Sequence, residues 1–246
     1  MWYNVKKEGA STLASAEWEF GTFHKDNQTV EILCSVAPKE YDPSKTTASI
    51  MVNDKEVPMT FEGGKCIANI PVSVFEEIEI TQVMFYKGEM IRAEGLEWFI
   101  TPLQEFLPSV DAYLGGSSMG AGKNGKFHWS SKDTLEVFIG KKNEDYAVKS
   151  ITIVRCLDGK ETDRVEMPLQ ENLTDYFWTV DLEYEIPYGS TQEIYVDVVD
   201  SLGLCYRSWI DYTSVEEDGG YIGGDPYSTE KMILDQSGKE LYRGFW

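Results

Sequence analysis

The feature that most constrains the fold of this chain is an alternation of apolar and polar residues with a period of two. In one run the apolar residues Val30, Ile32 and Val36 are separated by polar residues such as Glu31 and Ser35. Successive side chains of a strand point to opposite faces, so this pattern indicates a strand that is buried on one side. Comparable runs occupy 66–72, 135–139 and 194–198. The helical period of 3.6 residues is almost missing, and the sequence therefore predicts an all-β protein.

Turn residues separate these runs and predict how the strands are joined. Asn53-Asp54, Gly63-Gly64 and Asp158-Gly159 each stand between two β-prone runs and are typical hairpin tips. Short strands with a turn about every 8 to 12 residues are typical of sandwiches rather than of a parallel α/β sheet. We therefore expect immunoglobulin-like β-sandwiches.

The two halves of the chain repeat the same order of elements. The hairpin at 52–59 corresponds to the one at 158–168, and the aromatic strand that ends near Trp98 corresponds to the one near Trp209. An internal duplication of about 100 residues explains this agreement. We expect a first sandwich at 1–102, a second at 103–214, and an acidic, glycine-rich tail at 215–246 that could form a β-hairpin.

The charge of the chain limits its partners. There are 42 acidic and 22 basic residues, which gives a formal net charge of −20. Such a surface repels phosphate backbones and anionic lipid head groups, so we expect no nucleic-acid binding. No apolar run reaches the ~18 to 20 residues that span a bilayer, so we expect no membrane insertion by this segment.

Candidate catalytic motifs fail on their spacing. The run Gly120–Asn124 suggests a phosphate-binding loop, but Ser117 stands where the pattern needs glycine and Asn124 where it needs Ser or Thr. His24 and His128 have no nucleophile placed by a known motif, and no His or Cys pair has zinc spacing. We predict that the protein has no catalytic residues and is not an enzyme.

Metal and cysteine chemistry leave two alternatives open. The acidic stretches 216–225 and 143–145 could offer oxygen ligands to calcium, although neither has the spacing of an EF-hand loop. We expect no other cofactor. Cys34 and Cys66 lie in phase with core residues and could form a disulfide, while Cys156 and Cys205 are less well placed for one. Otherwise the thiols are small buried hydrophobes.

Aromatic residues outside the repeats are the candidates for a contact surface. Trp18, Trp98, Trp129, Trp178 and Trp209 recur at strand positions in both halves, which favours packing on a core or a strand face. Aromatic residues near the end of the chain have no such place and are harder to bury. The predicted contact surface consists of Tyr221, Tyr227, Tyr242, Phe245 and Trp246.

Four segments carry a resemblance to a known group of proteins: 36–41, 52–59, 194–204 and 233–242. In these segments the chain resembles the extracellular part of uncharacterised single-pass membrane proteins from gut Firmicutes. Those proteins have a membrane helix and a coiled-coil stalk before two β-sandwich modules and an acidic tail. The resemblance implies that the chain is an excised ectodomain from the cell surface or envelope, anchored in the membrane in its full-length form. It supplies no catalytic residues.

These observations predict a non-enzymatic ectodomain for binding, sensing or spacing that acts by protein contact. A phage or virion structural protein is an alternative, because tandem sandwiches occur there as well. A carbohydrate-binding surface module is a second alternative, since tryptophan and tyrosine rings stack on sugars. A third is an acidic mimic of DNA that inhibits a nucleic-acid-binding protein, which follows from the net charge of −20.

Overall fold

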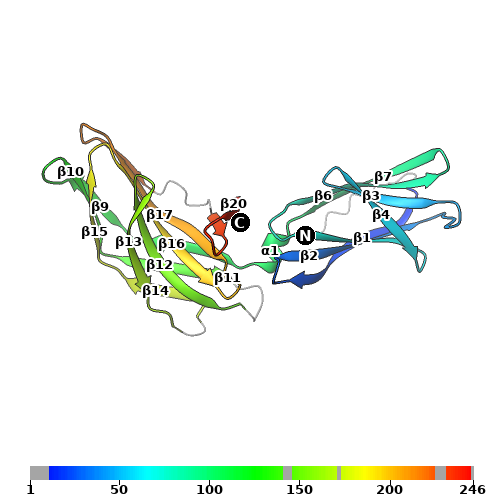
Figure 1. Ribbon diagram of the computed structural model, residues 1–246, viewed down its shortest axis with the longest axis horizontal. Helices are drawn as coiled ribbons and strands as arrows, with labels where there is room; N and C mark the ends of the chain where they lie inside the picture. The colour runs from blue at the N-terminus through cyan, green and yellow to red at the C-terminus, as the bar shows by residue number, and fades with distance from the viewer. Residues whose placement is uncertain (1–10, 141–145, 171–172, 225–230, 245–246) are drawn as a thin grey trace. The chain divides into compact units, whose positions relative to one another are not determined.

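The computed structural model describes residues 11–140, 146–170, 173–224 and 231–244 (Figure 1). Its elements are β-strands, apart from one short helix, α1 (Pro102–Phe106), in the described residues. The chain divides into two compact units, Met1–Phe106 and Leu107–Trp246. The prediction of an all-β protein is confirmed.

The first unit is a sandwich of seven strands. One sheet has the strand order β1-β2-β5-β4, and the other has the order β3-β6-β7. The two sheets are joined through β4, which also pairs with β3. The first half of β4 pairs with β3 and its second half pairs with β5, so this strand passes from one sheet to the other. Lettered A to G along the chain, the sheets are ABED and CFG, which is the immunoglobulin-like arrangement. The strands are β1 (Leu13–His24), β2 (Thr29–Pro38), β3 (Thr47–Val52), β4 (Lys55–Glu62), β5 (Lys65–Ser73), β6 (Ile78–Lys87) and β7 (Met90–Ile100).

The alternating residues predicted from the sequence form the core of this unit. Val30, Ile32, Cys34 and Val36 on β2 are fully buried, whereas the intervening residues are partly exposed. At the β3–β4 tip, Asn53 and Asp54 have φ values of 44° and 60°. This left-handed pair matches the right-handed twist of the two strands, which is why Asn and Asp suit the tip.

The second unit is also a sandwich, but the strands of one sheet are each broken near their middle. The two resulting sheets have the orders β14-β11-β8 and β15-β10-β9. The opposite sheet has the order β13-β12-β16-β17-β19-β20, with β18 also paired to β17. The strands are β8 (Ser109–Leu114), β9 (Ser117–Ala121), β10 (Lys126–Ser131), β11 (Thr134–Gly140), β12 (Val148–Leu157), β13 (Lys160–Met167), β14 (Asp175–Thr179), β15 (Leu182–Pro187), β16 (Thr191–Asp200), β17 (Cys205–Val215), β18 (Tyr221–Gly224), β19 (Lys231–Leu234) and β20 (Glu240–Gly244).

Equivalent hairpins recur in the two units, as the sequence comparison predicts. The β12–β13 hairpin takes the place that β3–β4 has in the first unit, and its tip residues Asp158 and Gly159 also have positive φ. The β16–β17 hairpin corresponds in the same way to β6–β7. The order of strands therefore repeats, although the second unit is larger.

The region after residue 214 contains a β-hairpin, which the sequence left open as a possibility, and a further short strand. Strand β17 continues to Val215, and β18 pairs with its last residues. The hairpin β19–β20 pairs with the first part of β17, and Met232, Ile233 and Leu234 are buried. An unpaired edge strand exposes a row of backbone donors and acceptors, and these added strands satisfy the row on β17. The sequence allowed this hairpin but did not decide whether it docks, and the structure pairs it with β17.

The cysteines are free thiols in this structure. Strands β2 and β5 are neighbours, but Cys34 lies opposite Ala68, and Cys66 lies opposite Val36. The two thiols are thus diagonal neighbours, for which the Cβ separation is about 7 Å and a disulfide needs about 4 Å. The suggested Cys34–Cys66 disulfide is therefore corrected to two buried thiols. Burial raises the pKa of Cys34 to about 12, which makes it a poor nucleophile.

Candidate functional site

The outer surface of the β14-β11-β8 sheet carries three aromatic rings, one from each strand. Tyr113 is 48% exposed and Phe177 is 55% exposed, while Phe138 lies partly buried between them. The ring centroids of Tyr113 and Phe138 are 6.1 Å apart, and those of Phe138 and Phe177 are 5.8 Å apart. We call these three rings and the three carboxylates beside them, Asp111, Glu136 and Asp175, the open face.

Strand register arranges the open face as a checkerboard. Glu136 lies opposite both Tyr113 and Phe177 in one row across the sheet. In the next row Phe138 lies opposite both Asp111 and Asp175. Directly opposite residues have Cβ atoms about 4.5–5.5 Å apart, so every ring has a carboxylate as an immediate neighbour.

The inward residues of the same strands explain why the rings point outward. Ala112, Val137 and Tyr176 alternate with the open-face residues and are buried. Because the side-chain period of a strand is two, burial of this set turns the acid and aromatic set toward solvent.

The carboxylates of the open face differ in their partners. Asp111 Oδ1 lies 2.6 Å from Nζ of Lys231, whose side chain is buried at the start of β19. In the part of the chain that the structure describes, no basic side chain forms an ion pair with Glu136 or Asp175. The strands β8, β11 and β14 themselves contain no lysine or arginine. The open face therefore combines exposed rings with negative charge.

The other sheet of this unit has aromatic residues on its outer surface too, but they are covered. Tyr195 packs with Val154 and Cys156, and Trp209 lies against this small cluster. The guanidinium carbon of Arg207 lies 3.7 Å from the centroid of the Tyr195 ring. We call this cluster, with the charged side chains over it, the covered face.

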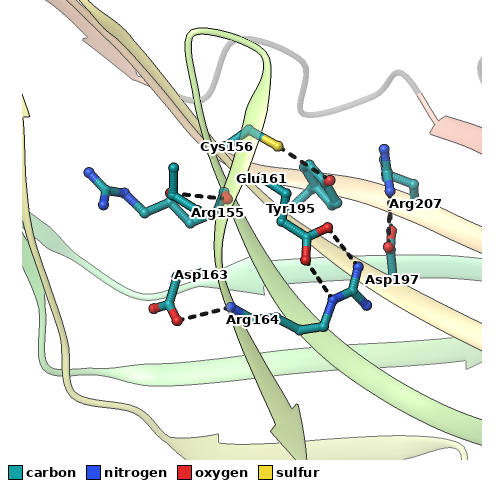
Figure 2. A network of polar contacts seen from close by, with 9 residues as sticks. Arg155, Cys156, Glu161, Asp163, Arg164, Tyr195, Asp197 and Arg207 are labelled. Carbon is teal, nitrogen blue, oxygen red and sulfur yellow. Dashed lines mark hydrogen bonds and ion pairs between the residues drawn. The ribbon is translucent and has the colours of Figure 1, made fainter.

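Each arginine on the covered face also donates hydrogen bonds to a carboxylate. Arg207 donates to both oxygens of Asp197, at 2.8 and 3.0 Å. Arg164 donates to both oxygens of Glu161 at 2.9 Å. Figure 2 shows the Arg207–Asp197 pair and the Glu161–Arg164 pair close to Tyr195. The Cys156 thiol lies 3.5 Å from the tyrosine hydroxyl. On the edge strand β20, Arg243 lies over Trp209 and donates to Glu240.

The titratable groups of the covered face are suited to structure rather than to chemistry. Burial, with the hydrogen bond to Cys156 as a smaller cause, raises the pKa of Tyr195 far above its ordinary value. Burial also raises the pKa of Cys205 to about 12. Both groups are therefore neutral near pH 7, where a catalytic base or nucleophile needs a pKa close to the working pH.

The two histidines lie in different units and each faces glutamate. His24 Nε2 is 3.7 Å from Glu31, and His128 Nδ1 is 3.3 Å from Glu185. The glycine-rich run before His128 forms the β9–β10 tip, beside an open depression that Lys123 and Lys126 also line. It is a strand-to-strand turn, so it has no helix N-terminus with which to bind phosphate.

The predicted calcium stretches lie partly outside the described residues, which exclude 143–145 and Asp225. In the described part, Asp218 Oδ1 accepts the backbone N–H of Gly220 at 2.9 Å and so shapes a turn. No group of three or more His, Cys, Asp or Glu side chains in the described ranges is arranged to hold a metal ion.

The predicted contact surface is only partly described. Tyr221 is 51% exposed, and its ring lies 4.6 Å from that of Phe127. Tyr242 is half-buried on β20. Tyr227, Phe245 and Trp246 lie outside the described residues.

Sequence reasoning missed the open face, although the strands carry a signal for it. Each contains an acid, one inward residue and an aromatic: Asp111-Ala-Tyr113, Glu136-Val-Phe138 and Asp175-Tyr-Phe177. Three copies of this acid-x-aromatic pattern on strands of one sheet point to a shared surface. The pattern becomes visible only when the pairing of the strands is known.

Comparison with known proteins adds little to this picture. No protein-family model and no curated protein matches the chain. Among solved structures, the chain is similar to a central fibronectin-III array of RIM-binding protein. That match has 10% identity, covers 94% of both chains and has a TM-score of 0.22. At that score it carries no argument, and the assignment to immunoglobulin-like sandwiches rests on the strand order.

Proposed function

We propose that this protein is a non-enzymatic binding module that contacts another protein through the open face of its second unit. The observation that carries the proposal is the exposure of Tyr113 and Phe177 beside Phe138 on one sheet surface. Single exposed apolar residues are normal, whereas adjacent aromatic rings are typical of the centres of protein interfaces. The protein would serve in recognition or sensing, or would hold a bound partner at a distance.

A location outside the cell or in the cell envelope is part of this proposal. The resemblance of the sequence to anchored ectodomains supports it, as does the prevalence of immunoglobulin-like sandwiches among cell-surface proteins. Within the described residues, no helix combines the length and apolar character needed to cross a bilayer.

Glycan binding is the second candidate, because exposed rings can stack on sugars and carboxylates can accept hydrogen bonds from hydroxyls. We favour protein contact because the open face is the outer surface of a three-stranded sheet, whereas small-ligand sites usually lie in concave pockets with a few convergent polar groups. The depression beside His128 belongs to a different sheet from the open face.

The test compares binding to a peptide library and to a glycan array for the purified protein and two variants. Tyr113→Ser/Phe177→Ser removes the exposed rings of the open face. Phe99→Ser is the matched control, because Phe99 is 74% exposed but lies on the first unit. We expect peptide binding that the double variant loses and the control retains. Selective glycan binding, or peptide binding that survives the double substitution, would contradict the proposal.

A further inference from the structure

We infer that the open face binds an arginine-bearing, extended segment of a partner protein; this inference rests on the proposed function and names the class of its partner. Each arginine would place its guanidinium over a ring of the open face and donate hydrogen bonds to Glu136 or Asp175. The argument comes from the way the same unit covers its other aromatic side chains.

The covered face is an internal template for this recognition. Arg207 stacks on the ring of Tyr195 and at the same time donates two hydrogen bonds to Asp197. Asp197 lies directly opposite Arg207 and one row away from Tyr195 on the same strand face. Ring, carboxylate and guanidinium thus form one unit, in which a planar cation satisfies both neighbours.

A second example occurs on a different part of the same unit. The guanidinium carbon of Arg155 lies 4.4 Å from the centroid of the Tyr184 ring. The hydroxyl of Tyr184 donates to Asp163 at 3.0 Å, so an acid again accompanies the ring. Arg155 itself donates to the Gln192 side chain and to the backbone oxygen of Glu185, so this second case repeats the arginine–ring contact beside an acid but not the bond to the carboxylate.

The open face has two of these three components. Glu136 lies between the exposed rings of Tyr113 and Phe177, and Asp175 lies beside Phe138. In the described residues the cation is supplied only at Asp111, by Lys231. Among the described residues, Glu136 and Asp175 lack a cation that could also lie flat on Phe177 or Phe138.

Spacing and net charge favour an extended basic segment over a single small cation. The two rows of the checkerboard are two residues apart along each strand, a distance of about 7 Å. An extended partner segment has the same spacing between side chains two positions apart, so an Arg-x-Arg sequence fits both rows. The net charge of −20 also attracts basic partners over a longer range.

Arginine fits better than lysine because its guanidinium is planar and offers a fork of donors. It can stack on a ring while it bonds a carboxylate, whereas an ammonium group is a compact, strongly hydrated point charge. Because the open face is exposed to solvent, water competes for each contact and weakens it. The dissociation constant of a short peptide should therefore lie in the micromolar to millimolar range.

The experiment measures binding of fluorescent peptides to the full chain by anisotropy at low salt. The probes share a Gly/Ser background and carry Arg-x-Arg, Lys-x-Lys, or the neutral isostere citrulline at both positions. Glu136→Gln/Asp175→Asn removes the charges but keeps the rings. Glu62→Gln/Glu89→Gln is the matched control, because both glutamates are exposed on the first unit.

We expect the arginine peptide to bind best, with an affinity about 3-fold to 10-fold above that of the lysine peptide. Glu136→Gln/Asp175→Asn should weaken it about 10-fold or more, while the control pair changes it by less than about 2-fold. No binding of the arginine peptide at 1 mM, equal binding of the citrulline peptide, or equal losses in the two carboxylate variants would overturn the inference.

The same variants separate this inference from the proposed function. If library peptides without arginine bind, and Tyr113→Ser/Phe177→Ser abolishes that binding while Glu136→Gln/Asp175→Asn does not, the arginine inference fails and protein contact stands. Sedimentation identifies another occupant: a dimer of the chain that the ring variant dissociates would replace the arginine segment with a second copy. If neither variant affects any peptide binding, the open face is not the site and both proposals fail.

Discussion

The covered face and the open face lie on opposite sheets of the same unit and are built from the same kinds of residue. Each places aromatic rings beside carboxylates on the outer surface of a sandwich, where polar side chains are usual. On the covered face Arg207 lies over Tyr195 and bonds Asp197. On the open face Tyr113 and Phe177 are about half exposed. The difference shows that aromatic rings on the outer surface are shielded from solvent where neighbouring strands supply arginine side chains.

Among the described residues, the two faces differ in sheet width, and this explains why arginines lie over the rings of one face and not over Phe138 or Phe177 on the other. The covered sheet extends from β13 at one edge to β20 at the other, and these added strands bring Arg164 and Arg243. The open face has three strands, none of which contains a basic residue. A wider sheet surrounds its central rings with side chains, while a narrow sheet leaves them accessible to a partner.

The largest expected effect comes from opening the covered face. Arg207→Ala would leave Asp197, which is 5% exposed, as a buried carboxylate without its cation. Loss of one partner from such a pair costs about 3–5 kcal/mol of unfolding free energy. Urea unfolding should show this loss. The double variant Arg207→Met/Asp197→Leu should recover much of it, and a loss below about 1 kcal/mol for Arg207→Ala would show that the face is not stabilised in this way.

Removal of a ring from each face should separate packing from binding. Trp209→Ala takes a partly buried ring from the cluster of Tyr195 and Val154, and we expect a loss of about 2–3 kcal/mol. The matched change Phe177→Ser takes a ring that is 55% exposed and should alter stability by less than about 0.5 kcal/mol. Calorimetry and urea unfolding can measure both. Equal destabilisation by the two substitutions would mean that the faces do not differ in packing.

A change at Lys231 should make the open face more negative at modest cost. Lys231→Met keeps the buried stem but releases Asp111, whose side chain is 35% exposed and can be hydrated. We expect a loss of about 1–2 kcal/mol, because the freed carboxylate keeps access to water. The arginine peptide should then bind more tightly to the released carboxylate. Weaker binding by a folded Lys231→Met protein would contradict the role of charge on this face.

Acidification should loosen the covered face through Glu161. The hydrogen bonds from Arg164 lower the pKa of this carboxyl below its ordinary value of 4.5. A lowered folded-state pKa gives stability that is fully present above pH 4.5 and is lost as pH falls through the folded-state value. The pair is solvent-exposed, so the whole effect should be less than about 1 kcal/mol.

Urea unfolding from pH 7 to pH 3 can test this expectation by comparison with Glu161→Gln. The variant should be less stable than the wild type at pH 7 and should approach it as the pH falls. A difference that stays constant with pH would show that ionisation of Glu161 contributes nothing.

The second unit also shows where prediction from sequence stops. Alternation predicts that Ile194, Val196 and Val198 are buried, and they are. The stretch 176–184 is rich in β-prone residues throughout, yet the structure divides it between β14 and β15. The sequence allowed a hairpin near Met232 to Leu234 but could not decide whether it docks on β17, because pairing with a distant edge leaves no local pattern.

The sequence by itself determined the period of two, and with it the all-β class, the buried residues of the regular strands and the tips at Asn53-Asp54 and Asp158-Gly159. These properties depend on residues that are close along the chain. Only the tertiary structure decided that the acid-x-aromatic segments of β8, β11 and β14 form one surface and that arginines cover the opposite one. Both depend on which strands are neighbours, and strand pairing joins residues that are distant in sequence.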